Sequence, residues 1–157
     1  MGPLLDTAIE FLRQQGWSFT QLDGQAVLQF RFTGSTASWN CYVQSKEPQA
    51  RLICYSVAPR PAPEARCMAM AELVARANYG LVIGNFELDM DDGEVRYKTS
   101  IDVSGASVTV ALIRTLVHVN VRAMNHYLPA IEAVIDGAPS PRALIAELEG
   151  QTPPTGP

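Results

Sequence analysis

Residues 84–102 read GNFELDMDDGEVRYKTSID, and the fold can be worked outward from this stretch. Apolar and polar side chains alternate over residues 86–90 and again over residues 95–98, which is the pattern of β-strands with one buried face. Asp92-Gly93 lies between the two runs and is a favoured hairpin turn. The stretch therefore predicts an antiparallel hairpin in which acidic side chains of the first strand face basic side chains of the second.

The chain before this hairpin predicts a helix, a meander of strands and a second helix. Apolar residues between Leu4 and Leu12 recur at helical spacing, and Gly16 is suited to end that helix. Strands of period two are expected over residues 28–33, 37–44 and 51–57, with a shorter one over 17–22. The prolines of segment 58–66 interrupt the sheet, and Pro63 is expected to begin a helix that ends near Gly80.

The chain after the hairpin predicts one long helix and one short helix. Residues 108–121, VTVALIRTLVHVNV, fit a strand by alternation, but helical spacing persists for four turns and favours a helix capped by Ser107 or Thr109. Pro129 is expected to kink this helix or to begin another one. Ser140-Pro141 is expected to begin the last helix.

These elements predict a single α+β domain over residues 1–150, followed by a flexible tail over residues 151–157. The expected order is helix, three or four strands, helix, hairpin, long helix and short helix (α-β-β-β-α-β-β-α-α). Because the strands follow one another through short polar connections, the sheet should be antiparallel, with the helices in a second layer. A parallel, doubly wound sheet is excluded, since most strands lack the crossover helix between them.

Charge and composition exclude several classes of partner. The net charge is −4, from 12 basic and 16 acidic residues, and the basic residues are scattered, which argues against nucleic acid. The longest apolar stretch, residues 108–121, contains Arg114 and His118 and is too short to span a bilayer. The N-terminus shows no basic leader, and three evenly spaced cysteines suit reduced, buried thiols, so a cytoplasmic location is expected.

The sequence contains no motif that binds a cofactor or activates a nucleophile. The acidic segment 89–94, DMDDGE, is not a calcium loop, because glycine and glutamate do not stand at its sixth and twelfth positions. His118 and His126 are eight residues apart, which is not the spacing of a metal pair on one helix. We therefore expect no catalytic, cofactor-binding or metal-binding residue, and a protein that is not an enzyme.

The long helix carries apolar residues on more than one side, and a two-layer domain buries such a helix only in part. A second copy of the chain would cover the remainder by symmetry, so we expect a homodimer. The candidate interface residues are Phe86, Val119 and Asn120. Asn120 also has a structural interpretation, since a buried amide needs a partner and can fix the register of a helix.

Residues 78–145 resemble the YbjN family of bacterial sensory-transduction regulators. The matching features are NYGLVIGNFELDMDDGEVRYKTSID, the helix HYLPAIEAVIDG with Tyr127 and Pro129, and the Ser140-Pro141 pair after it. The order of elements over the whole chain is similar to the type III secretion chaperone-like fold. The resemblance implies a helix–sheet–helix domain, often dimeric, that binds other proteins and does not turn over a substrate.

The candidate partner-binding residues are aromatic side chains of the meander, namely Phe30, Phe32, Trp39 and Tyr42. A partner segment would lie over apolar patches of the sheet and helix, or add a strand to a sheet edge. Alternation leaves open which sheet face is covered, and whether the acidic hairpin 87–94 is a docking surface or only a soluble edge. The alternative function is a small-molecule sensor, with a pocket between sheet and long helix to which His118 or Asn120 adds polarity.

Overall fold

The computed structural model describes residues 2–150, so the tail expected at residues 151–157 lies outside the described residues. Its helices are α1 (Pro3–Gln14), α2 (Cys67–Gly80), α3 (Val110–Ile135) and α4 (Pro141–Gly150). Its strands are β1 (Phe19–Gln21), β2 (Val27–Thr33), β3 (Ser38–Lys46), β4 (Arg51–Val57), β5 (Asn85–Leu88) and β6 (Val95–Asp102).

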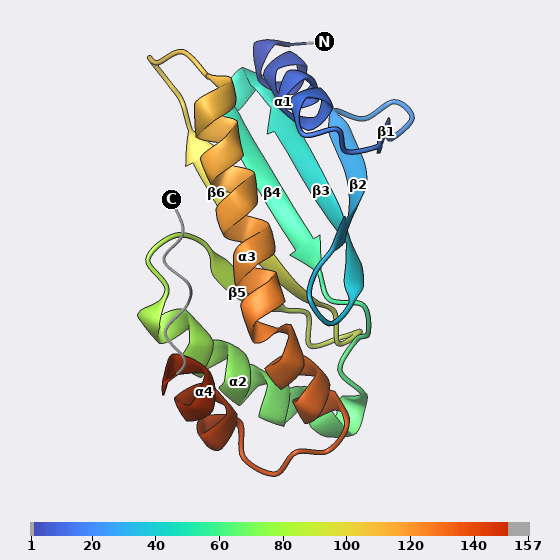
Figure 1. Ribbon diagram of the computed structural model, residues 1–157, viewed down its shortest axis with the longest axis vertical. Helices are drawn as coiled ribbons and strands as arrows, with labels where there is room; N and C mark the ends of the chain where they lie inside the picture. Colours follow the sequence, from blue (N-terminus) through green and yellow to red (C-terminus); the bar gives the residue numbers. More distant parts are fainter. Residues whose placement is uncertain (1, 151–157) are drawn as a thin grey trace.

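The six strands form one antiparallel sheet in the order β1-β2-β3-β4-β6-β5. Helices α1 and α3 lie over one face of this sheet, and α2 and α4 lie together at one end of the molecule (Figure 1). The predicted α+β arrangement is confirmed, with β1 making four strands before α2.

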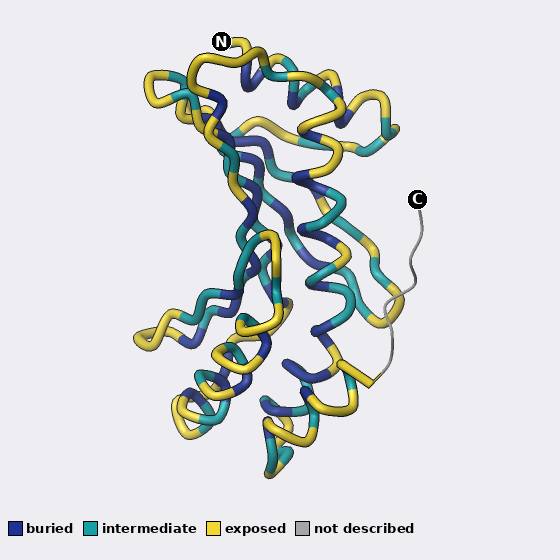
Figure 2. The backbone as a smooth tube through the Cα atoms, turned by 90° about the vertical axis from the view of Figure 1, so that its left-hand side faces the viewer, coloured by how far each residue is buried: buried dark blue, intermediate teal, exposed yellow. Residues whose placement is uncertain are grey.

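The core lies between the helices and one face of the sheet. Along β3, Trp39, Cys41 and Val43 are at most 1% exposed, whereas Asn40 and Tyr42 between them are only half-buried. Figure 2 shows the sheet beside α3, with the far side of β2, β3 and β4 free of any described helix. We call this uncovered side the open face. It is formed by alternate residues of the strands: Gln29, Arg31, Asn40, Tyr42, Gln44, Ile53, Tyr55, Val57, Arg96 and Lys98.

The hairpin of β5 and β6 differs from the prediction in its register. A turn at Asp92-Gly93 would pair Leu88 with Tyr97, but the structure pairs Leu88 with Val95 and leaves residues 89–94 in the connection. The carboxylates of two aspartates in this connection accept backbone N–H groups two residues onward, which favours the longer turn. Because the shift is two residues, every side chain keeps its predicted face.

Helix α2, which follows the proline-rich segment, begins later than predicted. A 3-10 turn occupies Glu64–Arg66, and the α-helix starts at Cys67 rather than at Pro63. The segment lies along the hairpin, because the Ala62 N–H donates to the Gly93 carbonyl at 2.8 Å. Gly93 has φ +79°, and a Cβ there would stand 2.0 Å from the Ala62 oxygen, so only glycine fits this contact.

Helix α3 continues through Pro129 to Ile135 as one element, so no new helix begins at this proline. Proline has no backbone N–H, so the carbonyl four residues earlier loses its helical hydrogen-bond donor. Because Pro129 is exposed, this carbonyl can face solvent instead. Of the two predicted caps, Thr109 is the one used: its Oγ1 accepts a hydrogen bond from the Leu112 N–H at 3.2 Å.

Candidate protein-binding surface

The open face is centred on two tyrosines from neighbouring strands. Tyr42 of β3 and Tyr55 of β4 are direct partners in the register, and both are half-buried. Directly opposed residues bring their Cβ atoms to about 5 Å, so the two rings form one aromatic surface. Such rings offer apolar contact area together with a hydroxyl group for hydrogen bonding, the combination that protein interfaces favour.

A shallow hollow of about 330 Å³ lies at this centre. Val27 and Val57 make its apolar floor together with the two tyrosines, and Arg96 closes one side. The Arg96 guanidinium lies 4.5 Å from the centre of the Tyr55 ring, in a cation–π contact that holds the ring in place. The open face thus carries an aromatic depression at its centre.

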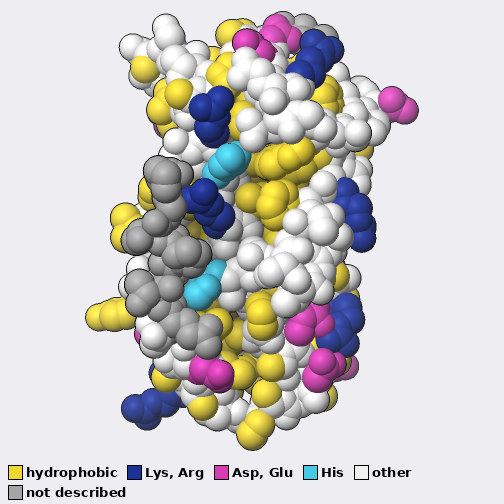
Figure 3. Space-filling view, in the orientation of Figure 1, with side chains coloured by type: hydrophobic (Ala, Val, Ile, Leu, Met, Phe, Trp, Pro, Cys, Tyr) yellow, Lys and Arg dark blue, Asp and Glu magenta, His cyan; other side chains and the backbone are white. Residues whose placement is uncertain are grey.

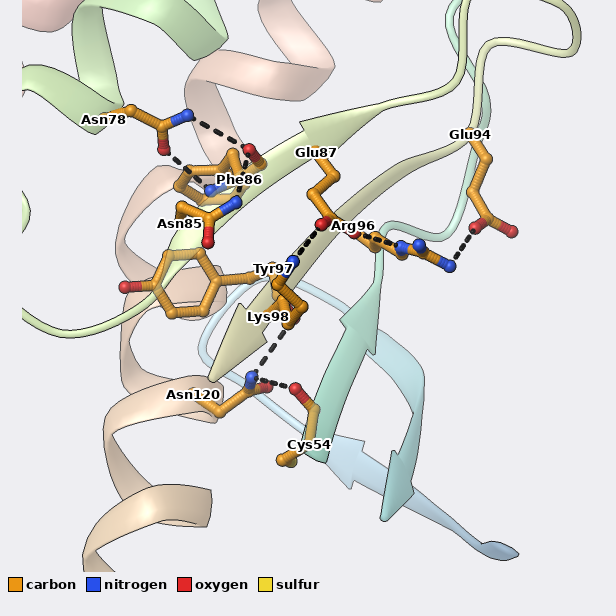
Figure 4. A network of polar contacts seen from close by, with 10 residues as sticks. All are labelled: Cys54, Asn78, Asn85, Phe86, Glu87, Glu94, Arg96, Tyr97, Lys98 and Asn120. Carbon is orange, nitrogen blue, oxygen red and sulfur yellow. Dashed lines mark hydrogen bonds and ion pairs between the residues drawn. The ribbon is translucent and has the colours of Figure 1, made fainter. Parts of the chain in front are cut away.

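An ion-pair group fixes the basic side of the open face (Figure 4). Glu87 of β5 accepts from Arg96 Nε at 2.7 Å and also from the Lys98 ammonium. Partial burial opposes ionisation of Glu87, but the hydrogen bonds from Lys98 and Arg96 outweigh it and lower the pKa of this carboxyl. The predicted pairing of acidic and basic side chains across the hairpin is present at this group.

The four candidate partner-binding residues lie on opposite faces of the sheet. Tyr42 is on the open face, but Phe30, Phe32 and Trp39 point to the helix side. Phe30 and Trp39 are 2% and 1% exposed, and Trp39 Nε1 donates to the buried Ser56 hydroxyl at 3.0 Å. These two rings are core in this fold, because α1, α3 and Trp17 cover them; Phe32 keeps a half-exposed edge.

Asn120 is buried within one protomer and ties α3 to the sheet (Figure 4). Its Nδ2 donates to the backbone oxygens of Cys54 at 2.9 Å and Tyr97 at 3.1 Å, and it lies 3.2 Å from the Thr99 hydroxyl. A side chain with 0% exposure has no surface to give to a second copy, so its assignment to a dimer interface is corrected. Its Nδ2 donors are engaged within the protomer, whereas its Oδ1 has no donor among the described residues.

Phe86 is also a core residue, being 3% exposed. Its ring meets Tyr97 and Tyr127 edge-on, at centroid distances of 4.7 and 5.3 Å. This packing removes the Phe86 side chain from a dimer interface, because its surface is already covered. Val119 is half-buried on α3 and is the candidate interface residue that retains accessible surface.

The backbone of Phe86 is closed to strand addition by a side chain of α2. Asn78 Oδ1 accepts from the Phe86 N–H at 2.7 Å, and Asn78 Nδ2 donates to the Phe86 oxygen at 3.0 Å. The amide thus imitates a neighbouring strand and satisfies the edge of β5. Sequence reasoning missed this role of Asn78, because it depends on a contact between distant elements.

Residues 2–150 contain no group of three His, Cys, Asp or Glu side chains placed to hold a metal ion. The three cysteines are buried free thiols, and burial is the main cause that raises the pKa of Cys41 to about 12. Within the described helices, none has the length and apolar character needed to cross a membrane.

Comparison with known proteins identifies related sequences and folds. Residues 5–133 match the YbjN family, described as "Putative bacterial sensory transduction regulator". The crystal structure of YbjN from E. coli is similar with a TM-score of 0.63 and 17% identity, covering 82% of this chain and 89% of that one. A chain of the ExsC–ExsE complex is similar with a TM-score of 0.53 and 11% identity, covering 80% and 91%. No curated protein sequence matches the chain.

Proposed function

The chain belongs to the YbjN family, and from this premise we propose that it is a protein-binding regulatory module, without enzymatic activity, that works as a homodimer in the bacterial cytoplasm. The observation that carries the proposal is the open face, a sheet surface with an aromatic centre that no described helix covers. An isolated domain gains nothing by exposing paired tyrosines, whereas a partner segment can bury them.

The shared fold gives this assignment further support. The ExsC–ExsE structure is by its name a complex, and this chain has the fold of one of its chains over 80% of its length. In the proposed complex, a partner segment crosses the open face and places one large side chain in the hollow between Tyr42 and Tyr55. Because Asn78 closes the edge of β5, we expect contact through side chains on this face rather than strand addition at Phe86.

Replacing both Tyr42 and Tyr55 by Ser is expected to remove the partner. Loss of a central aromatic residue from an interface costs about 2 kcal/mol or more, so the two substitutions together should lower affinity about 1,000-fold. The measurement is native mass spectrometry of the tagged protein recovered gently from its own cell lysate. The matched control is Tyr79→Ser, since Tyr79 is 96% exposed and lies outside the open face.

The wild-type protein and the control should carry the same additional polypeptide, and the double variant should lack it. Equal capture of this polypeptide by all three proteins contradicts the assignment of the open face. A small-molecule adduct in place of any polypeptide contradicts the protein-binding function and favours the sensor.

For the homodimer we propose the flank of α3 that carries Val119. Leu112 lies two turns before Val119 on the same side of the helix and is 39% exposed. The apolar connection between α2 and β5 and the helix α3 both bond to strand β6. The Tyr97 hydroxyl of β6 donates to the Ile83 oxygen of the connection, and the Thr99 hydroxyl of β6 donates to the Leu116 oxygen of α3 at 2.9 Å. Exposed apolar side chains of this kind suit an interface between copies.

Val119→Asp is expected to yield a soluble monomer, because a carboxylate in an apolar interface loses its hydration without a partner. The measurement is the mass in solution by light scattering, which should fall from twice 17.1 kDa to 17.1 kDa. Ala143→Asp, at an exposed position of α4, is the control and should leave the mass unchanged. An unchanged dimer in Val119→Asp contradicts this choice of interface.

A further inference from the structure

Three side chains on the outer side of α3 form a line beside α1. Arg114, His118 and Arg122 follow one another at intervals of four residues, which places them along one side of the helix. Arg114 and Arg122 are exposed, and His118 is half-buried. In Figure 3 basic and histidine side chains descend along α3, and a group of hydrophobic side chains lies directly beside them, below α1.

Aromatic rings make up the surface beside this line. Trp17 stacks on His118 with a centroid distance of 6.0 Å and an interplanar angle of 25°, and its edge-on contact with Phe32 is 5.6 Å. Both Trp17 and Phe32 are half-buried, so each keeps part of its surface accessible. Phe30 stacks under Trp17 at 5.3 Å and holds it in place. We call Arg114, His118, Arg122, Trp17 and Phe32 the basic–aromatic strip.

The two arginines of the strip are unpaired among the described residues. Arg51, Arg60, Arg76 and Arg96 all form ion pairs, but none joins Arg114 or Arg122 to an acidic side chain of residues 2–150. Burial, followed by the charges of Arg122 and Arg114, lowers the pKa of His118. At the C-terminal end of α1, the neutral Gln15 side chain lies 3.3 Å from the histidine ring. Two free cations thus stand beside an apolar surface in a protein of net charge −4.

We propose that the basic–aromatic strip docks an acidic, extended segment of a partner protein. Arg114 and Arg122 are eight residues apart, about 12 Å along the helix. Four residues of an extended chain span about 13 Å, and the side chains at the first, third and fifth positions point the same way. A segment with acids at the first and fifth positions therefore reaches both arginines, and an aromatic residue at the third meets Trp17 and Phe32.

The same chemistry argues against a nucleic acid as the occupant. Affinity for nucleic acid grows with the number of phosphates neutralised, and the strip offers only two cations on an acidic protein. This inference rests on the proposed function in one respect, the existence of a protein partner. The two surfaces are separate, since the strip and the open face lie on opposite sides of the sheet.

The test is fluorescence anisotropy with the labelled peptide GSGESFSEGSG on the full-length protein at about 50 mM salt, where exposed charges are weakly screened. The comparison peptides are GSGKSFSKGSG and GSGESASEGSG. The variant Arg114→Gln/Arg122→Gln removes both charges of the strip. Arg142→Gln, at an exposed position of α4, is the matched control.

The acidic aromatic peptide should bind the wild-type and control proteins and bind the strip variant at least tenfold more weakly. Both comparison peptides should bind the wild-type protein more weakly than the acidic aromatic peptide. Equal affinity for the Lys peptide, retained affinity in the strip variant, or no binding up to about 1 mM overturns the proposal. Tighter binding of a single-stranded dT oligonucleotide overturns it in favour of nucleic acid.

The strip variant also separates this proposal from the proposed function. If peptide binding fails as described but the native partner is still lost from Tyr42→Ser/Tyr55→Ser, the strip is not a docking site and the function stands. If both variants keep every polypeptide that the wild-type protein binds, both surface assignments fail. If the wild-type protein carries no polypeptide at all, the protein-binding function fails as well.

Discussion

Asn120→Asp is expected to lower the free energy of unfolding by about 3–5 kcal/mol at neutral pH. The substitution keeps the shape of the side chain but replaces the Nδ2 donor by oxygen. That oxygen would face the carbonyls of Cys54 and Tyr97, which now accept from Nδ2 at 2.9 and 3.1 Å. Asn120 Oδ1 already has no donor among the described residues, so nothing at the site favours a negative charge.

The defect should depend on pH with a definite sign. Burial without a cation raises the pKa of the introduced carboxyl above its unfolded value of about 3.9, so the folded state holds its proton more tightly than the unfolded state. Stability of the variant relative to the wild type should therefore fall as pH rises above about 4 and partly recover as pH returns toward 4. Urea unfolding followed by circular dichroism at several pH values measures both effects.

Asn125→Asp provides a matched control on the same helix. Asn125 uses its Oδ1, which accepts from the Ser35 N–H at 2.8 Å and from the Ser35 hydroxyl at 3.1 Å. A carboxylate preserves these two bonds, and the site is exposed to solvent, so the change should be within about 0.5 kcal/mol. A small effect of Asn120→Asp, equal to that of the control, contradicts the anchoring role of Asn120.

Trp39→Ala is expected to cost about 4 kcal/mol of stability, within the usual range for removing a buried Trp side chain. Trp39 is 1% exposed and packs on Phe32 at a centroid distance of 5.2 Å. The buried Ser56 hydroxyl would also lose the donor that now lies 3.0 Å away. The variant should unfold at much lower urea concentration than the wild type.

Tyr42→Ala tests the opposite face of the same strand. Tyr42 is half-buried on the open face, so its truncation should cost much less stability than that of Trp39 and should instead weaken partner binding. Together the two variants separate core from surface along β3. A large loss of stability in Tyr42→Ala with little loss in Trp39→Ala contradicts the assignment of the two faces.

The sequence predicted the elements of this fold well because each one carries its own period. The alternation of residues 95–98 and the helical spacing after Thr109 depend only on neighbours along the chain. The register of the hairpin was predicted wrongly, since the carboxylates of Asp89 and Asp92 stabilise a longer turn. Even so, a shift of two residues leaves the faces unchanged, and the pairing of Glu87 with basic side chains is found.

The candidate sites were harder to predict because they depend on contacts between distant segments. Asn120 meets Cys54, 66 residues away, and Asn78 closes the edge of β5 only because α2 packs beside it. The line of Arg114, His118 and Arg122 is visible in the sequence, but its neighbour Trp17 is about a hundred residues distant. No local sequence pattern indicates such a contact between distant residues.

By itself, the sequence of this protein determined where its helices and strands lie and which side chains of a strand share a face. Only the tertiary structure decided which face of the sheet is covered, and hence that Trp39 is core while Tyr42 and Tyr55 remain accessible. The physical reason is that an alternating pattern is unchanged when its two faces are exchanged, if both carry aromatic side chains. The choice is made by the packing of α1 and α3, which cover one face and leave the other uncovered.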